Sequence, residues 1–201
     1  MSDKKRFWNI VASFYTLMQE RKNSSLYDAL NMYALQYVNN TKEVLEVGCG
    51  TGQMTKALAE ASKSYIATDY SSRMIKRASK RKIANAQFQA MDALALDFAD
   101  SSFDVVVCAN TLHVIKDSEK ALNEIYRVLR PGGLLIAPTF IYEGKIHKVK
   151  LFILKVLGFK TYHKWEAKDF LSFIRAHGFN VIDKKPINAS PTMNLFLVGK
   201  K

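Results

Sequence analysis

The sequence predicts an α/β fold built on a largely parallel sheet. The main sign is a regular alternation, between residues 41 and 140, of short apolar runs with amphipathic stretches. Repeats of strand, helix and strand form right-handed crossovers, which bury both faces of a parallel sheet. A second sign is a final pair of apolar runs with a short connection containing Pro186 and Pro191, which favours antiparallel pairing.

The hydropathy pattern predicts the individual elements. The apolar runs expected as strands are 44–47, 65–68, 86–90, 103–109 and 134–140, followed by the final pair at 179–183 and 194–198. The amphipathic runs expected as helices between the first five strands are 53–62, 71–84 and 118–129. Ahead of them, an apolar face with helical spacing predicts a helix that starts at Ser25 and ends before Asn39.

Another helix is expected near the start of the chain. Eight apolar side chains between residues 7 and 18 fall on one face of a helix. The general rule favours burial of such a face in the core of the domain. The alternatives are a lid, or a helix lying on a membrane surface with help from Lys4, Lys5 and Arg6.

Length and composition indicate one globular domain spanning residues 1–201. The chain is 48% apolar and 24% charged, without repeats or stretches rich in Gly, Ser and Pro. Runs free of charged residues, such as 131–142 and 186–199, are shorter than the roughly 20 apolar residues that a membrane-spanning helix needs. A membrane-spanning protein is therefore not expected.

Cysteine usage and the first residues favour a cytoplasmic protein. Only Cys49 and Cys108 occur, which offers neither a disulfide framework nor a spaced set of metal ligands. The basic start of the chain is not followed by the apolar segment of an export signal. The net charge of +12 permits attraction to nucleic acid, anionic lipid or acidic small molecules without choosing among them.

A glycine-rich turn carries the chemical signal. Gly48, Gly50 and Gly52 follow a buried strand and precede a helix, so a ligand can approach the main chain where no Cβ intervenes. Asp69 lies 21 residues after Gly48, at the end of the next strand, where a carboxylate can accept hydrogen bonds from two ribose hydroxyls. Gln53 stands where a dinucleotide fingerprint needs glycine, which favours a compact nucleoside with an amino-acid tail.

With these features, residues 41–140 resemble a class I S-adenosylmethionine-dependent methyltransferase of the small UbiE-like group. The matching segments are 46–52 (Glu-x-Gly-x-Gly-x-Gly), 68–71 (Thr-Asp-Tyr-Ser), 90–93 (Ala-Met-Asp-Ala), 103–113 and 129–134 (Leu-Arg-Pro-Gly-Gly-Leu). The resemblance implies a Rossmann-like, doubly wound, mostly parallel sheet of seven strands with an antiparallel last strand. It also implies S-adenosylmethionine as cofactor and S-adenosylhomocysteine as product.

The resemblance assigns a role to individual residues. The glycine loop would contact the methionine part, Asp69 the ribose, and Asp92 with Ala93 the adenine. The other residues implied at the cofactor are Glu46 and Cys49 near the methionine end, Tyr70 beside the adenine and Asn110 near the sulfonium. Structural alternatives remain for two of them: a lysine that compensates Glu46, and a helix cap formed by Asp92.

The expected reaction is an in-line displacement at the sulfonium methyl group. The cofactor carries the activated methyl, so the protein has to align the acceptor and exclude water. Where the acceptor must lose a proton, His113 is the best placed base, with simple packing as its alternative. Asn110 is not followed by Pro-Pro-Tyr and neither cysteine follows a proline, which excludes resemblance to two classes of DNA methyltransferase.

The domain divides into four parts. These are an N-terminal helical lid (1–40), a cofactor-binding core (41–140), a helical cap that would set acceptor specificity (141–178) and a final strand pair (179–201). Within the cap, apolar residues alternate with lysines over 145–160, which indicates either a cover over the cleft or a contact with anionic membrane. Either arrangement predicts a small-molecule acceptor that is lipid-like, quinone-like or an aromatic acid.

A basic helix face leaves a second function open. The residues on this face are Arg73, Lys76, Arg77, Lys80 and Arg81. Its ordinary explanation is a solvated surface, whereas a phosphate-binding patch would indicate an RNA methyltransferase. No interleaved aromatic residues support RNA binding, so nucleic acid is not favoured. A third alternative is a cofactor-binding protein without transfer activity, and no obligate protein partner is inferred.

Overall fold

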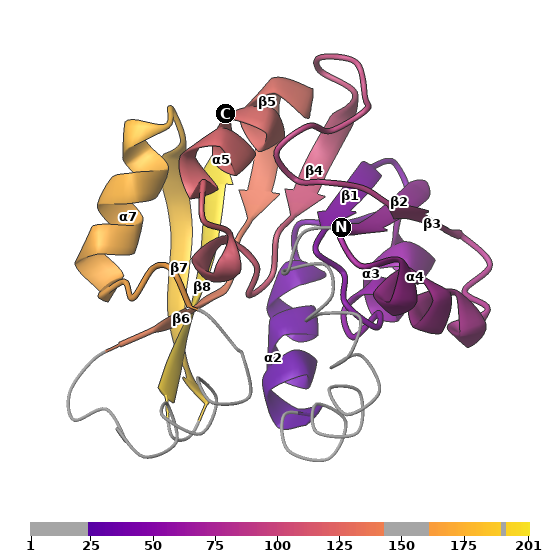
Figure 1. Cartoon of the computed structure of the whole chain (residues 1–201), viewed down its shortest axis with the longest axis horizontal. Helices are drawn as coiled ribbons and strands as arrows, with labels where there is room; N and C mark the ends of the chain where they lie inside the picture. Colours follow the sequence, from indigo (N-terminus) through magenta and orange to yellow (C-terminus); the bar gives the residue numbers. More distant parts are fainter. Residues whose placement is uncertain (1–23, 143–160, 190–191) are drawn as a thin grey trace.

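The fold is given by a computed structural model that describes residues 24–142, 161–189 and 192–201. Its centre is a single mixed sheet in the order β3-β2-β1-β4-β5-β8-β6, with β7 paired to β8 (Figure 1). The expected helix at 7–18 and the segment 145–160 lie outside the described residues. The predicted α/β class is confirmed.

Five parallel strands form the first part of the sheet. They are β1 (Glu43–Val47), β2 (Ser64–Asp69), β3 (Ala86–Ala90), β4 (Phe103–Val107) and β5 (Leu129–Ile136). The chain runs outward from β1 to β3 and then returns to the other side of β1 with β4. The order therefore reverses between β1 and β4, and crevices at such reversals hold ligands in open α/β sheets.

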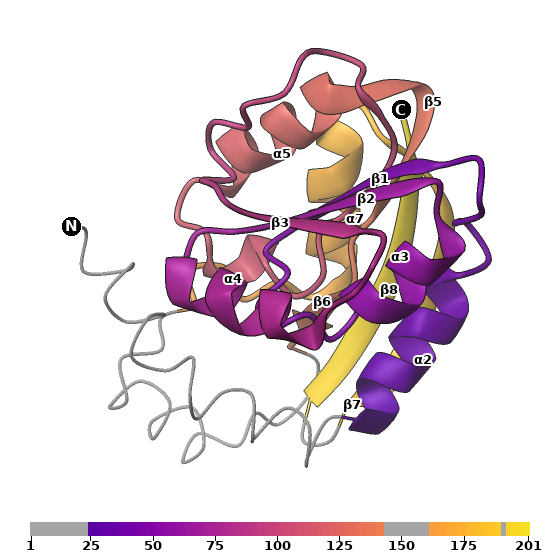
Figure 2. The same cartoon turned by 90° about the vertical axis from the view of Figure 1, so that its right-hand side faces the viewer.

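Helices cover both faces of the sheet. They are α2 (Ser24–Ala34), α3 (Thr55–Ala61), α4 (Ser72–Ala78), α5 (Ser118–Val128) and α7 (Ala167–Ala176), with short 3-10 turns at Ser79–Arg81 and Leu112–Val114. One buried cluster unites the apolar faces of α5 and α7, and a second unites those of α2 and α3. Figure 2 shows α5 on one side of the sheet and α2, α3 and α4 on the other. None of the described helices combines the length and apolarity needed to cross a bilayer.

The C-terminal part differs from the prediction in two ways. The run expected as one strand at 134–140 is divided near Pro138 into β5 and β6 (Thr139–Ile141). The final strands, β7 (Asn180–Ala189) and β8 (Thr192–Lys200), are longer than expected and form a hairpin. β7 pairs along the whole of one edge of β8, so β5 and β6 both pair with the opposite edge of β8, one after the other. With β5 and β6 separate, the sheet has eight strands instead of seven.

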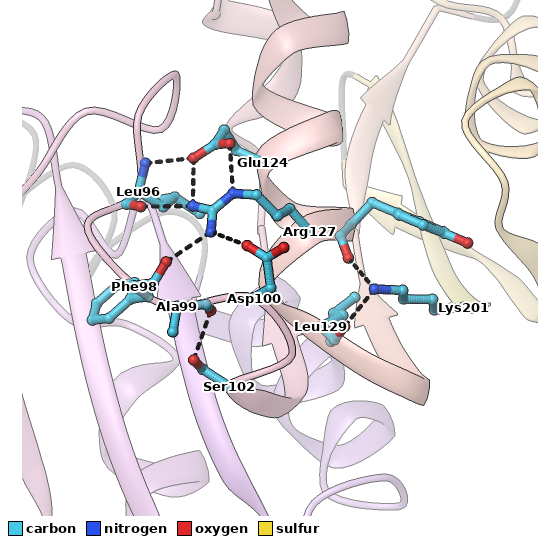
Figure 3. A network of polar contacts seen from close by, with 10 residues as sticks. Leu96, Phe98, Ala99, Asp100, Ser102, Glu124, Arg127, Leu129 and Lys201 are labelled. Atoms are coloured by element: carbon cyan, nitrogen blue, oxygen red, sulfur yellow. Dashed lines mark hydrogen bonds and ion pairs between the residues drawn. The ribbon is translucent and has the colours of Figure 1, made fainter.

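An arginine network attaches the β3–β4 connection to α5. The Arg127 guanidinium donates hydrogen bonds to the Leu96 and Phe98 carbonyls and pairs with Asp100 and Glu124 (Figure 3). Glu124 in turn accepts a hydrogen bond from the Leu96 amide at 2.8 Å. These bonds shape residues 96–100, in the same connection as the predicted adenine contacts.

Candidate active site

The glycine loop has a backbone that only glycine adopts easily. Gly48, Gly50 and Gly52 have φ values of 77°, 56° and 84°. A Cβ placed on Gly48 would clash with the Thr111 side-chain oxygen. The loop that follows β1 and the segment that follows β4 therefore touch, and a side chain at Gly48 would separate them.

Asp69 connects the glycine loop to the end of β2. Its Oδ2 accepts a hydrogen bond from the Gly50 amide at 2.9 Å, and its Oδ1 accepts one from the Ser71 amide at 2.8 Å. A carboxylate has about four acceptor positions, so two remain for the hydroxyls of a ribose. Burial raises the pKa of Asp69 to about 6, against the lowering effect of the two amides, so the side chain is ionised at neutral pH.

The adenine residues predicted after β3 lie next to Asp69. The Met91 amide donates to the Asp69 carbonyl at 3.0 Å, which places Asp92 beside the end of β2. Asp92 is exposed, and its Oδ1 accepts from the Leu94 amide at 3.0 Å. This bond closes a local turn and is not the helix cap considered above, because the described connection between β3 and β4 contains no helix, and it leaves Oδ2 for a ligand. Ala93 is half-buried and packs on the core, and Tyr70 is half-buried directly after Asp69.

Glu46 is buried below the glycine loop and has hydroxyl partners instead of the lysine considered above. Its Oε2 accepts hydrogen bonds from Thr55 at 2.6 Å and from Tyr65 at 2.9 Å. Burial, more than repulsion from Asp69, raises the pKa of Glu46 to about 7. The side chain is 2% exposed, so it acts on a ligand only by shaping the loop above it or through its Oε1.

Cys49 is part of the glycine loop, and Asn110 lies in the segment that follows β4. Cys49 is buried, and burial raises the pKa of its thiol well above the ordinary value, so its chemical reactivity is low. Asn110 has a positive φ of 52° and follows β4. Its side-chain oxygen accepts a hydrogen bond from Asn194 of β8 at 2.7 Å. Asn110 is also the neighbour in sequence of Thr111, the residue that contacts Gly48.

His113 is 3% exposed and lies in the short turn after β4. Its Nδ1 is 3.3 Å from the Thr139 hydroxyl, and its ring packs edge-on against Phe140. Burial, with a smaller effect of His163, lowers the pKa of His113 to about 4, so the ring is neutral at pH 7. If Nδ1 carries the proton and donates to Thr139, Nε2 is left as a proton acceptor.

Several site residues have no signal in the sequence. Thr55 and Tyr65 reach Glu46, and Thr111 packs on Gly48, only because the strands bring them together. Arg81, assigned above to the basic face, donates its Nε hydrogen to the Thr51 carbonyl at 2.6 Å. One member of that face is therefore attached to the glycine loop. Among the described residues, no cluster of His, Cys, Asp or Glu is arranged to hold a metal ion.

The donor set fits S-adenosylmethionine. The Gly50 amide of the glycine loop is held by a carboxylate with two acceptor positions left, and a second carboxylate follows the neighbouring strand. Asp69 would hold the ribose, Asp92 the adenine amino group, and the glycine loop the methionine part. All three lie at the carboxyl ends of β1, β2 and β3, where ligands bind in this class of sheet.

Comparison with known proteins identifies the family of the chain. A family model described as a methyltransferase domain matches residues 45–137. The chain is 33% identical over 162 residues to a demethylmenaquinone methyltransferase of Staphylococcus epidermidis, covering 75% of this chain and 66% of the relative. A Renibacterium salmoninarum enzyme of the same name is 40% identical over 99 residues, covering 49% and 41%. The chain thus spans between 41% and 66% of the length of these relatives.

A solved structure has the same fold. It is a Haloferax volcanii methyltransferase in complex with its Trm112 activator, with a TM-score of 0.80, 18% identity and 96% coverage of both chains. The sequence motifs, the glycine cradle and these similarities point to one family. The chain belongs to the class I S-adenosylmethionine-dependent methyltransferases.

Proposed function

We propose that the protein transfers the methyl group of S-adenosylmethionine to a small, apolar, aromatic or lipid-like molecule. The observation that carries this proposal is the hydrogen bond from the Gly50 amide to Asp69 Oδ2, which unites the glycine cradle and the ribose acceptor. The cofactor supplies an activated methyl group, which leaves the sulfur as the acceptor attacks in line. The protein contributes alignment and a dry site, which together are worth roughly 7–11 kcal/mol in favourable cases.

The described residues divide the work of binding. Asp69 holds the ribose through acceptor positions that the Gly50 and Ser71 amides leave unused. Gly48 makes room for the Thr111 side chain, which supports the loop from β4, and the methionine part would lie along the main chain of this loop. Glu46 holds Thr55 and Tyr65 beneath the loop, which keeps the loop in place before the cofactor arrives.

His113 is the proposed base for acceptors that lose a proton. Thr139 fixes the side of the ring that carries Nδ1, and the neutral state of the ring at pH 7 is the one that accepts protons. Its low pKa makes it a weak base, so it suits an acidic acceptor such as a phenol or enol better than an amine.

A quinone-like ring is the acceptor class that we favour. The relatives at 33% and 40% identity are named for demethylmenaquinone, and the sequence predicts an apolar acceptor site. The second half of the expected site, residues 145–160, lies outside the described chain, so acceptor specificity rests on the relatives and on the sequence.

A transfer assay tests the proposal. The protein is incubated with labelled S-adenosylmethionine and a panel containing a reduced short-chain demethylmenaquinone, an aromatic acid, a fatty acid and transfer RNA. We expect label in the quinone product with wild type and none with Asp69→Ala. Asp97→Ala is the matched control, because Asp97 is exposed and outside the site. Label in RNA alone would replace the proposal with RNA methylation, and cofactor binding without transfer to any acceptor, in the panel or in cell extract, would indicate a binding protein.

A further inference from the structure

Two asparagines from distant parts of the chain form a buried pair. Asn194 of β8 is 0% exposed, and its Nδ2 donates to Asn110 Oδ1 at 2.7 Å. The other two polar atoms of the pair, Asn110 Nδ2 and Asn194 Oδ1, are buried and have no hydrogen-bond partner. In the described part of the chain, the one other side-chain atom in this state is Oδ1 of Asn31.

Such a pair is costly unless something binds it. A buried donor or acceptor without a partner has lost its hydrogen bonds to water and destabilises the fold, and native proteins satisfy nearly all such groups. The pair always offers one donor and one acceptor. If both amides were turned end for end, Asn110 would donate to Asn194, and one acceptor and one donor would again remain.

The position of the pair is that of a ligand contact. Asn110 follows β4 at the carboxyl edge of the sheet, and its backbone amide donates a hydrogen bond to the Pro138 carbonyl at 2.7 Å. Its neighbour Thr111 contacts Gly48 of the cradle. Asn194 reaches the same place from β8, between Phe140 of β6 and Ile187 of β7. The unpaired donor and acceptor therefore lie next to the segment that contacts the glycine loop, at the carboxyl edge of the sheet.

We infer that Asn110 and Asn194 bind one hydroxyl group of the methyl acceptor. A hydroxyl accepts from Asn110 Nδ2 and donates to Asn194 Oδ1, so a single group satisfies both atoms. The inference rests on the proposed function and specifies it: the acceptor carries a phenolic or enolic hydroxyl close to the atom that is methylated. A ring that lacks this hydroxyl leaves both amides unpaired and binds less well.

A binding comparison tests this without requiring turnover. The probes are 1-naphthol and 1-methylnaphthalene, which differ in the hydroxyl, added to protein loaded with S-adenosylhomocysteine. We expect the preference for naphthol, expressed as the ratio of the two Kd values, to fall at least about tenfold in Asn194→Leu. The same substitution at Asn188, which is exposed on β7, should leave the ratio unchanged. A second readout needs no variant: naphthol alone should shift the side-chain amide NMR signal of Asn110.

The outcomes separate the inference from the proposed function. An unchanged ratio in Asn194→Leu, or an amide signal that ignores naphthol, overturns the inference. Weaker S-adenosylhomocysteine binding with an unchanged ratio would assign the pair to the cofactor and also overturns it. Failure of methyl transfer together with a clear naphthol preference would instead reject the proposed reaction and leave the hydroxyl site supported.

Discussion

Asp69 Oδ2 accepts a hydrogen bond from the Gly50 amide at 2.9 Å, so the predicted ribose acceptor and the glycine cradle form one unit. Gly50 lies in the connection that follows β1 and Asp69 is the last residue of β2, and each supports the conformation of the other. A change at Asp69 therefore removes the proposed ribose contact and also the hydrogen bond to the glycine loop. Substitutions that keep one of these effects can separate them.

Cofactor affinity is predicted to depend on the Asp69 carboxylate. Asp69→Ala should weaken S-adenosylmethionine binding at least about a hundredfold, because two hydrogen bonds to a charged acceptor are lost. Binding favours the ionised form and the pKa in the free protein is about 6, so wild-type affinity should fall as the pH drops below 6. Asp69→Asn should bind weakly and lack this acidic decline. Calorimetry between about pH 5 and pH 8, the range in which a group with this pKa titrates, measures the affinity of each variant and its dependence on pH. Wild-type affinity in Asp69→Ala would contradict the assignment.

Glu46 is predicted to lower stability as the pH rises. Its pKa in the folded chain is about 7 against an ordinary value of 4.5, so between these values the folded state keeps a proton that the unfolded state releases. Glu46→Gln keeps an oxygen for Thr55 and Tyr65 and cannot ionise. As the pH rises through this range, the free energy of unfolding of Glu46→Gln should increase by about 3 kcal/mol relative to that of the wild type. Urea denaturation at several pH values measures the difference, and a constant difference would show that Glu46 has an ordinary pKa.

Gly48→Ala is predicted to destabilise the fold by about 2 kcal/mol or more. The substitution combines an unfavourable φ of 77° with a clash against Thr111. Gly132→Ala is the matched control, since its φ is also 77° but the nearest atom to its Cβ would be 3.8 Å away. Thr111→Ala should recover part of the loss in Gly48→Ala, with a coupling of about 1 kcal/mol in a double-mutant cycle. Equal losses at Gly48 and Gly132 would mean that the contact with Thr111 is unimportant.

Arg127→Met is predicted to cost about 2 kcal/mol of unfolding free energy, since two carbonyls and two carboxylates lose their donor. Lysine should not replace it, because one ammonium group cannot reach all four partners. The variant should also weaken cofactor binding, because the connection that carries Asp92 loses its anchor. Lys168→Met serves as the control: its ion pair with Glu166 is exposed, and its loss should be nearly neutral. Denaturant unfolding that finds the two variants alike would remove the structural role of the network.

His113→Gln is predicted to reduce kcat by about a hundredfold with an acidic acceptor, while cofactor affinity stays near wild type. The pKa of about 4 also predicts that the wild-type rate is independent of pH above about 5, apart from the titration of the acceptor and the cofactor site. The control is His177→Gln, whose ring bonds to the Phe173 carbonyl in α7. Unchanged turnover in His113→Gln would exclude His113 as an essential base and leave it a packing residue.

The features of this protein that could be predicted are those that depend on residues close together in the sequence. The alternation of strands and helices, the glycine loop and Asp69 at the end of the second strand depend on short-range spacing and backbone conformation. The structure confirms the sheet class and brings Gly50, Asp69 and Asp92 to one edge. The sequence predicted one strand over 134–140, whereas the structure divides this run into β5 and β6. Pro138 was the signal for the division, because proline cannot donate a backbone hydrogen bond in the middle of a sheet.

Other features depended on tertiary packing. Asn110 and Asn194 are 84 positions apart, and the network of Arg127 joins segments about 30 residues distant. Hydropathy and local propensity carry no information on which polar groups meet in the core. Strand order and register decide that, because they fix which backbone positions lie side by side. The sheet class and the methyltransferase family could thus be deduced from the chain, whereas the buried amides and the shifted pKa values of Glu46 and His113 result from burial, which only the folded structure decides.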